Sequence, residues 1–261
     1  MVSRRALLAA AAGSALVAGC TDGSAGSTTT NHSASPTATT SSTTPASTTA
    51  SATTAVPSRA VREAVEVRHG SRTAPLVALT FHGSGDPALA KKLLHRLETH
   101  SVHATVMAVG TWLRAEPEMA RRITSAGHEL GNHTLHHYAM RTLAPRTTFD
   151  EIDGCAHVLR RLTGGEGTWF RASGTQATTP IIRRAAARAG YSRCISYDVD
   201  GLDWEDPSAG TVTSAVLDGT RKGSIISLHL GHPVTVDALP DVLDGLHARG
   251  LKPVTLTELL A

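Results

Sequence analysis

The sequence predicts an α/β fold built on a parallel sheet, either open or closed into a barrel. From Leu76 onward, short apolar runs alternate with amphipathic stretches of helical periodicity. Gly127, Gly190 and Gly250 each follow the last periodic residue of such a stretch, as helix C-terminal glycines do. Repeated strand–helix units favour a parallel sheet, which places a functional site at the carboxyl ends of its strands.

The elements are expected in alternating order. Strands are predicted at 76–81, 102–109, 128–131, 168–171, 193–199, 224–230 and 252–255, where the chain is apolar over short runs. Helices are predicted between them at 87–100, 112–126, 148–162, 179–189, 208–221 and 236–249.

Residues 1–19 are expected to be an export signal. Arg4 and Arg5 precede a short apolar run, in a pattern similar to a twin-arginine signal. The run ends in Val-Ala-Gly-Cys at 17–20, which resembles a bacterial lipobox and predicts lipidation of Cys20. The alternative is a cleaved secretory peptide in which Cys20 has no special role.

Residues 20–60 are rich in Ser, Thr and Pro and have almost no large apolar side chains. Such a segment cannot bury enough surface to offset chain entropy, so we expect a disordered tether. We assign 61–75 to a lead-in segment and 76–261 to a catalytic domain. The expected protein is exported and lipid-anchored to the outer face of the cell membrane, within the cell wall.

The net charge of the chain argues against a polyanionic partner. Lys and Arg number 25 against 22 Asp and Glu, and two of the arginines belong to the predicted export signal. The remainder is nearly neutral and has no basic cluster, so we expect no nucleic-acid binding. No apolar stripe predicts an oligomer, and we expect a monomer. Cys155 is in step with Ile152 and Leu159 on a helix face, which predicts a buried thiol.

Titratable side chains follow five of the predicted strands. His133 and His137 are one helical turn apart, a spacing that can hold one divalent ion. The other clusters lie at 82–86, 171–173, 198–204 and at His229.

Four blocks of sequence resemble the polysaccharide deacetylase family, the NodB-homology domain of carbohydrate esterase family 4. They are Gly-Asn-His-Thr at 131–134 with His137, Trp-Phe-Arg at 169–171, Asp200-x-x-Asp203-Trp204, and Gly-Ser-Ile-Ile-Ser-Leu-His at 223–229. The resemblance implies a distorted, incomplete (β/α) barrel that removes acetyl groups from cell-wall sugars with metal-activated water.

The resemblance also implies roles for individual residues. His133 and His137 would bind a divalent metal, expected to be zinc with cobalt or nickel as alternatives, and His229 would be the general acid. Arg171 would orient the base, and Asp203 or Asp200 would tune the acid. Trp204 would stack on a sugar, and backbone donors near Ser173 and Gly174 would face the substrate.

The first block departs from the family pattern. The family has Thr-Phe-Asp-Asp-Gly-Pro, whereas this chain has His82 and Gly83 in place of the two carboxylates that act as base and metal ligand. Two alternatives remain open. A bulged loop could return Asp86 to the site as ligand or base, or His82 could be a third imidazole ligand.

The sequence therefore predicts a hydrolase that removes acetyl groups from N-acetylated or O-acetylated wall polysaccharide such as peptidoglycan. The altered first block leaves two alternatives. One is a catalytically impaired, glycan-binding wall lipoprotein, and the other is a hydrolase of a different amide or ester.

Overall fold

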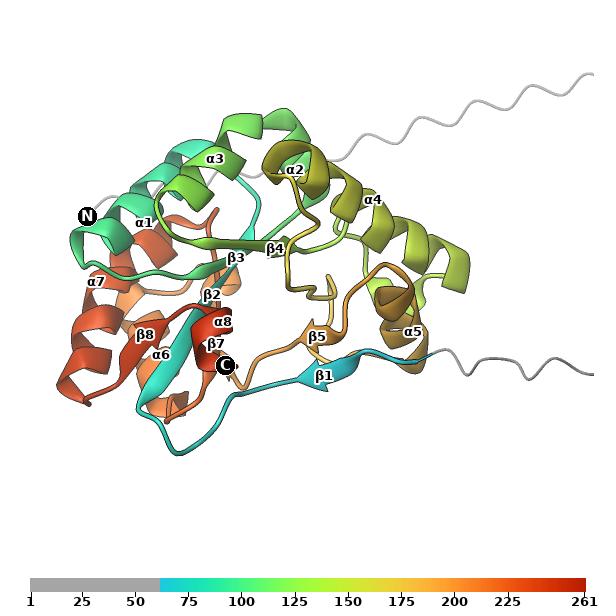
Figure 1. Ribbon diagram of the computed structural model, residues 1–261. Coiled ribbons are helices and arrows are strands. Elements are labelled where there is room, and N and C mark those ends of the chain that lie inside the picture. The colour runs from blue at the N-terminus through green and yellow to red at the C-terminus, as the bar shows by residue number, and fades with distance from the viewer. Residues whose placement is uncertain (1–61) are drawn as a thin grey trace, which may run out of the picture. The chain divides into compact units, whose positions relative to one another are not determined.

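The computed structural model describes residues 62–261 (Figure 1). The predicted export signal, the tether and Cys20 lie outside the described residues. Within the described part, none of the helices combines the length and the apolar character that crossing a membrane requires.

The strands form a parallel sheet that curls into an incomplete barrel. They are β1 (Val65–Val67), β2 (Leu76–Gly83), β3 (Thr105–Ala108), β4 (Glu129–Asn132), β5 (Arg193–Ile195), β6 (Val199–Asp200), β7 (Ile225–His229) and β8 (Lys252–Val254). One sheet has the order β4-β3-β2-β7-β6, with β8 also paired to β2, and β1 pairs with β5. Isolated parallel bridges from Asn132 to Phe170 and from Phe170 to Cys194 connect β4 to β5. Among the described strands, the two end strands β1 and β6 do not pair with each other, so the barrel is not closed.

Helices cover the outside of this curved sheet (Figure 1). The 3₁₀ turns are η1 (Met140–Thr142) and η2 (Asp203–Glu205), and the short helix α8 (Leu256–Leu259) instead packs against Ala78, Met107 and Ile225 on the inner side of the curve. The outer helices are α1 (Pro87–Thr99), α2 (Gly110–Ala115), α3 (Pro117–Ser125), α4 (Pro145–Thr163), α5 (Pro180–Arg188), α6 (Ala209–Gly219) and α7 (Pro233–Ala248). Five of them begin with a proline, whose fixed φ suits the first helical turn.

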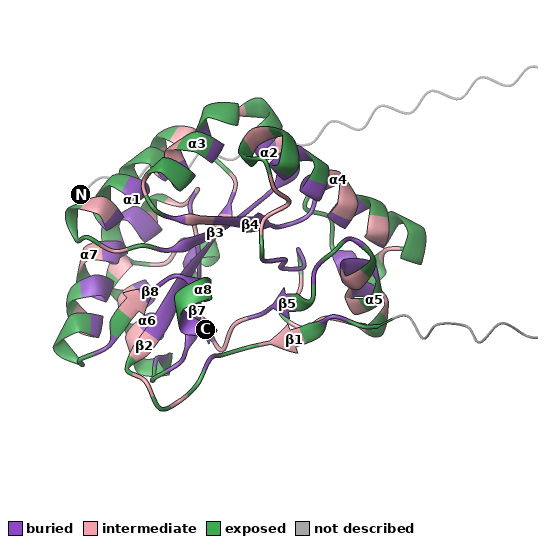
Figure 2. Ribbon diagram, in the orientation of Figure 1, coloured by how far each residue is buried: buried purple, intermediate pink, exposed green. Residues whose placement is uncertain are grey.

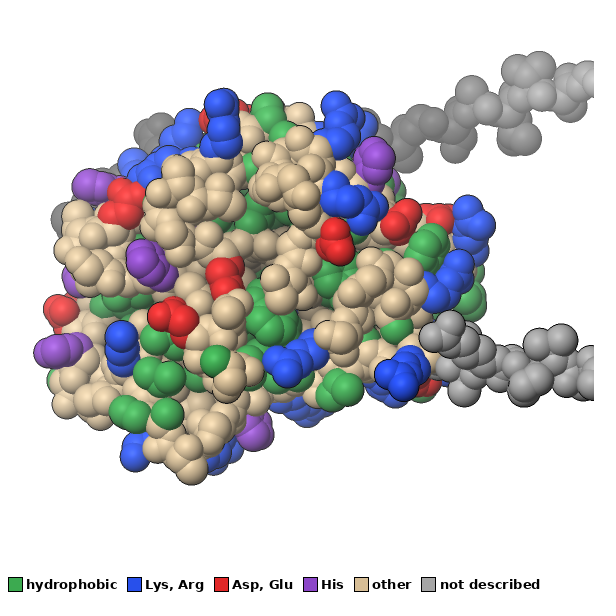
Figure 3. Space-filling model, viewed as in Figure 1, with side chains coloured by type: hydrophobic (Ala, Val, Ile, Leu, Met, Phe, Trp, Pro, Cys, Tyr) green, Lys and Arg blue, Asp and Glu red, His purple; other side chains and the backbone are tan. Residues whose placement is uncertain are grey.

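The strands at the centre are buried, as Figure 2 shows in purple. The middle of β2 and all of β3 have no exposed residue, which explains their continuous apolar runs. Side chains of β2, β3 and β7 pack with those of the outer helices in the largest apolar cluster. Both cysteines of the described part, Cys155 and Cys194, are buried free thiols, as predicted for Cys155. Acidic and basic side chains both occur across the face in Figure 3.

Most predicted elements are confirmed, and the exceptions have local causes. The helix expected at 112–126 is two helices, because Pro117 lacks an N–H and holds Glu116 at non-helical angles. The strand expected at 193–199 is divided into β5 and β6, and the one expected at 168–171 is reduced to the bridge at Phe170. Strand β1, inside the expected lead-in segment, and helix α8 were not predicted. Gly127, Gly190 and Gly250 have positive φ, as their predicted role requires.

Candidate active site

Three imidazoles converge at the carboxyl ends of β2 and β4. His82 lies near the end of β2, His133 directly follows β4, and His137 comes one turn later. One nitrogen from each of the three lies within 4.8 Å of the others. The parallel register of β2 and β7 sets His82 beside His229, and their rings stack with centroids 4.4 Å apart. The structure thus brings together the four histidines that the sequence singled out.

Hydrogen bonds fix the orientation of the two innermost rings. His82 Nδ1 lies 2.7 Å from His133 Nε2, and His82 Nε2 lies 2.9 Å from the Ser227 hydroxyl. On the far side of its ring, His133 Nδ1 lies 2.9 Å from the carbonyl oxygen of Arg171. Because the Arg171 carbonyl can only accept, neutral His133 has its N–H on Nδ1 and presents a lone pair on Nε2 toward His82 Nδ1.

The loop that carries His133 and His137 is braced by buried polar groups. Thr134 and His137 both have positive φ, which is unusual for residues other than glycine. The Asn132 side chain accepts a hydrogen bond from Thr134 N and donates to Ile152 O on α4. These contacts offset the backbone strain and hold the two imidazoles near each other.

Burial keeps the inner imidazoles neutral. Desolvation lowers the pKa of His82 and of His133 well below the ordinary value, and the positive charges of the neighbouring histidines and Arg171 act in the same direction. Burial, followed by the charge of His229, also lowers the pKa of His137. Neutral imidazole is the form that binds a metal ion.

Asp203, and not Asp200, contacts His229. The buried Asp203 carboxylate lies 2.8 Å from His229 Nδ1 and accepts a hydrogen bond from His229 N at 2.7 Å. Thr235 Oγ1 donates to the same carboxylate. Asp200 instead accepts from Leu202 N and lies on the wall of the adjoining pocket. The sequence left these two aspartates as alternatives, and it gave no sign of Thr235 or Ser227.

A pocket of about 480 Å³ opens beside the histidines. It is lined by His82, His137, Ala172, Gly174, Thr175, Gln176, Tyr197, Asp200, Trp204 and His229. Trp204 is half exposed. Ser173 is buried, and its hydroxyl bonds Thr134 Oγ1 and Tyr138 O, so it braces the loop and its side chain does not face the pocket.

Arg171 is a buried cation that forms no salt bridge with a carboxylate among the described residues. Its Nε and Nη2 donate to the carbonyls of Ile195 and Ser196, and its guanidinium lies over the ring of Tyr197. Nη1 has no partner among the described residues. Burial lowers the pKa of Arg171 to about 10. A carboxylate at position 82, as in the family pattern, would be the natural partner. His82 does not replace it, because its two nitrogens contact His133 and Ser227.

Asp86 does not enter this site. The exposed Asp86 caps α1, where its carboxylate accepts a hydrogen bond from Ala88 N at 2.8 Å. Gly85, with φ of +90°, packs against Gly231, and Trp112 Nε1 donates to its carbonyl oxygen. The alternative in which a bulged loop returns Asp86 is thus not the conformation found. Asp directly before a helical proline is an N-cap signature, which the sequence contained.

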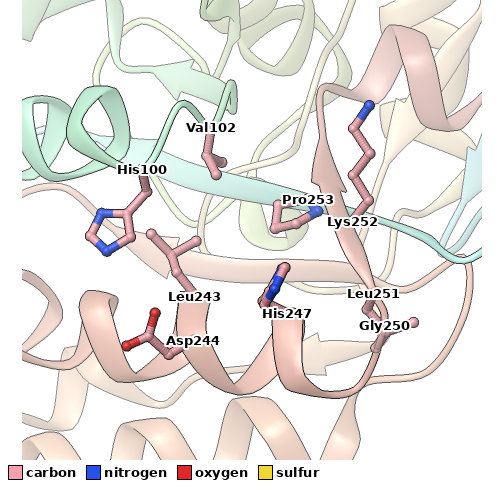
Figure 4. A pocket seen from close by; sticks show the side chains of 9 residues that line it. All are labelled: His100, Val102, Leu243, Asp244, His247, Gly250, Leu251, Lys252 and Pro253. Carbon is pink, nitrogen blue, oxygen red and sulfur yellow. The ribbon is translucent and has the colours of Figure 1, made fainter.

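A second hollow, of about 420 Å³, lies between the end of α7 and the start of β8 (Figure 4). His100, Asp244 and His247 are among its lining residues. Among the described residues, the metal-capable triad is found only at His82, His133 and His137. The described residues that line this hollow therefore do not form a metal-capable triad.

Fold and site together define an open parallel α/β barrel with a histidine cluster at the carboxyl ends of its strands. The sequence profile described as Polysaccharide deacetylase matches residues 69–194. A chitooligosaccharide deacetylase of Azorhizobium caulinodans is 31% identical over 170 residues, which cover 65% of this chain and 80% of that protein. A peptidoglycan-N-acetylglucosamine deacetylase of Bacillus cereus is 30% identical over 187 residues, covering 70% and 67%. The chain belongs to the polysaccharide deacetylase family.

Solved structures agree with this assignment. A peptidoglycan N-acetylglucosamine deacetylase superposes with a TM-score of 0.70 at 28% identity, over 75% of this chain and 92% of that one. A family 4 carbohydrate esterase from Streptomyces lividans gives 0.63 at 26%, over 68% and 91%. A pseudoenzyme of the same esterase family from Bacillus anthracis gives 0.71 at 25%, over 76% and 69%. The incomplete barrel expected from the sequence is thus confirmed.

Proposed function

We propose that this protein is a metal-dependent deacetylase that removes acetyl groups from an N-acetylated cell-wall glycan. The relatives named above are deacetylases of chitooligosaccharide and of peptidoglycan N-acetylglucosamine. The convergence of His82, His133 and His137 beside His229 is the observation that carries the proposal.

The donor set fits a zinc ion. Three neutral imidazoles with an open fourth position are a known catalytic zinc arrangement. Each of the two inner rings already has its outer nitrogen engaged, His82 by Ser227 and His133 by the Arg171 carbonyl, as ligating histidines usually do. Nitrogens sharing one tetrahedral zinc lie roughly 3.3 Å apart. The 2.7 Å contact between His82 and His133 must therefore widen by about half an ångström when a metal is held.

A metal in this position would polarise the acetyl carbonyl and lower the pKa of water. The chain itself supplies the remaining groups. Asp203 holds the His229 ring by Nδ1, which leaves Nε2 to carry the proton that the departing amine needs. Thr235 keeps the Asp203 carboxylate in place. Backbone N–H groups beside Gly174, which lines the pocket, would stabilise the developing oxyanion.

The general base of the proposed reaction must differ from the one in the family pattern. With His82 in place of the family aspartate, Asp200 is the one carboxylate among the residues that line the pocket. We assign it the role of accepting the proton from water. An Asp200→Asn variant should lose turnover and keep its metal.

The proposed substrate is a wall glycan such as peptidoglycan, presented to Trp204 at the pocket rim. N-acetyl sugars are favoured over O-acetyl sugars because the relatives act on N-acetylglucosamine. Lipidation of Cys20 and a tether through 20–60 would keep the domain at the outer face of the membrane within the wall, which we propose as its location. The protein would act there as a monomer.

A second function, glycan binding without catalysis, is favoured by one specific observation. The Nη1 atom of Arg171 has no hydrogen-bond partner among the described residues, whereas the family pattern offers a carboxylate at position 82. A structurally similar protein of Bacillus anthracis is a pseudoenzyme.

Acetate release separates the two functions. Purified protein loaded with zinc, cobalt or nickel is incubated with chitooligosaccharides and with peptidoglycan fragments, beside a His229→Ala variant. We expect release by the wild type and its loss in the variant. Glycan binding without release under every metal would contradict the deacetylase proposal and support the second function.

A further inference from the structure

Tyr138 is an exposed aromatic side chain next to the pocket. Among the described residues, four large apolar side chains are exposed, namely Val65, Tyr138, Leu202 and Trp204. Three of the four lie on the loops that follow β4 and β6, at the end of the sheet that carries the histidine cluster. Exposed apolar groups gathered beside a pocket indicate a binding surface.

One face of the Tyr138 ring packs on His136, and a buried acid holds His136 in place. The Tyr138 ring stacks on the His136 ring, with centroids 5.3 Å apart and planes at 20°. His136 Nδ1 lies 2.7 Å from one oxygen of Glu151, and the other oxygen accepts from His136 N at 2.8 Å. Glu151 is buried on α4. One ring face is therefore supported by a fixed stack, which lowers the entropy lost when a ligand covers the other face.

The backbone of Tyr138 is tied to the chain segment that carries Gly174, a residue of the pocket lining. Its carbonyl accepts a hydrogen bond from the Ser173 hydroxyl at 2.6 Å. The next residue, Ala139, packs so closely on Gly174 that a side chain at Gly174 would come within 2.9 Å of the Ala139 Cα. Tyr138 thus lies directly beside two residues of the pocket lining, His137 along the chain and Gly174 through the contact with Ala139.

The order of the strands separates Tyr138 from Trp204. Tyr138 follows β4 and Trp204 follows β6, which are the two outer strands of the six-stranded sheet. His82 on β2 and His229 on β7 lie on the strands between them. Four strand spacings amount to roughly 19 Å along a flat sheet, and less along a curved one. Trp204 is among the residues that line the pocket and Tyr138 is not, so a sugar ring held in the pocket against Trp204 leaves the Tyr138 ring available to another sugar.

We propose that Tyr138 is a second sugar-stacking site, distinct from Trp204, and that the protein takes a glycan chain of several sugars across the histidine cluster. This inference rests on the proposed function. A pyranose ring has an apolar face of C–H groups that packs on an aromatic ring, as exposed Tyr and Trp do at many interfaces. The pocket wall offers Thr175, Gln176 and a single carboxylate at Asp200, a lining suited to an uncharged sugar chain.

The test compares ligand lengths. Binding of the dimer and the hexamer of N-acetylglucosamine is measured by titration calorimetry in a His229→Ala background, which prevents turnover. We expect the hexamer to bind more tightly than the dimer. Tyr138→Ala should weaken hexamer binding roughly five- to tenfold and leave dimer binding unchanged. Tyr138→Phe should bind both as the parent does.

Val65→Ala is the matched control, because Val65 is an exposed apolar side chain on β1 and belongs neither to the pocket lining nor to the histidine cluster. It should bind both oligomers as the parent does. Equal hexamer affinity in the parent and in Tyr138→Ala would overturn the proposal, and so would an equal loss for dimer and hexamer. Because binding is the readout, the result is independent of whether the wild-type protein releases acetate.

Discussion

His82 Nδ1 lies 2.7 Å from His133 Nε2, across 51 positions of sequence. The outer nitrogens of the two rings are already bonded, to Ser227 and to the Arg171 carbonyl. Since desolvation keeps both rings neutral, at least one of the facing nitrogens presents a lone pair. We propose on this arrangement that His82 acts as the third metal ligand, a role that the family pattern gives to the carboxylate at the position of Gly83.

Removal of the Ser227 hydroxyl should weaken metal binding. In Ser227→Ala the His82 ring loses the contact that fixes its orientation, so we expect divalent-metal affinity to fall about 10- to 100-fold. Competition with a coloured chelator measures this. Ser214→Ala, at an exposed position on α6, is the control and should keep the parent affinity. Unchanged affinity in Ser227→Ala would remove Ser227 from the site.

The Asp203–His229 pair should govern turnover and not metal content. Asp203→Asn replaces the group that accepts from His229 Nδ1, and we expect kcat to fall about 10²- to 10⁴-fold with bound metal unchanged. Asp206→Asn is a matched control, because Asp206 makes the same contact with the neighbouring His232 outside the pocket. Equal losses of acetate release in both variants would contradict the assignment of His229 as the acid.

The buried His128 should make the protein sensitive to acid. Burial, reinforced by His103 and Arg122 and opposed by Glu98, lowers its pKa to about 4. The unfolded chain takes up this proton below about pH 6.5, so the free energy of unfolding falls between pH 6.5 and 4, by at most about 3 kcal/mol.

Urea unfolding at several pH values, in the parent and in His128→Gln, measures this contribution. The variant should lose less stability than the parent between pH 6.5 and 4. The exposed His157→Gln should behave as the parent does. Identical pH slopes in the parent and in His128→Gln would show that His128 does not contribute.

Neither buried thiol should react in the native protein. Burial raises the pKa of Cys155 and of Cys194 to about 12, so the reactive thiolate is scarce at neutral pH. Alkylation at pH 8, followed by mass spectrometry, should leave both unmodified in the folded protein and modify both in urea. Rapid native labelling of either cysteine would show that its surroundings open readily.

The sequence predicted the sheet and the histidine cluster because their signals are local. The apolar run of β2 and the spacing of His133 and His137 are visible within a few residues. Ser227 and Thr235 escaped prediction because they meet His82 and Asp203 from strands and helices far along the chain. Strand β1 escaped because its three residues include the exposed Val65 and have no apolar run. The hypothesis that Asp86 returns to the site differs from the structure, in which Asp86 caps α1, as its place directly before Pro87 indicates.

Zinc content of the protein tests the central claim most directly. Protein dialysed against zinc and then freed of excess is analysed by elemental mass spectrometry for the wild type, His82→Ala and Asp86→Ala. We predict close to one zinc per chain in the wild type and in Asp86→Ala, and loss of zinc in His82→Ala. A wild type without zinc, or zinc that persists in His82→Ala and disappears in Asp86→Ala, would contradict a three-histidine site.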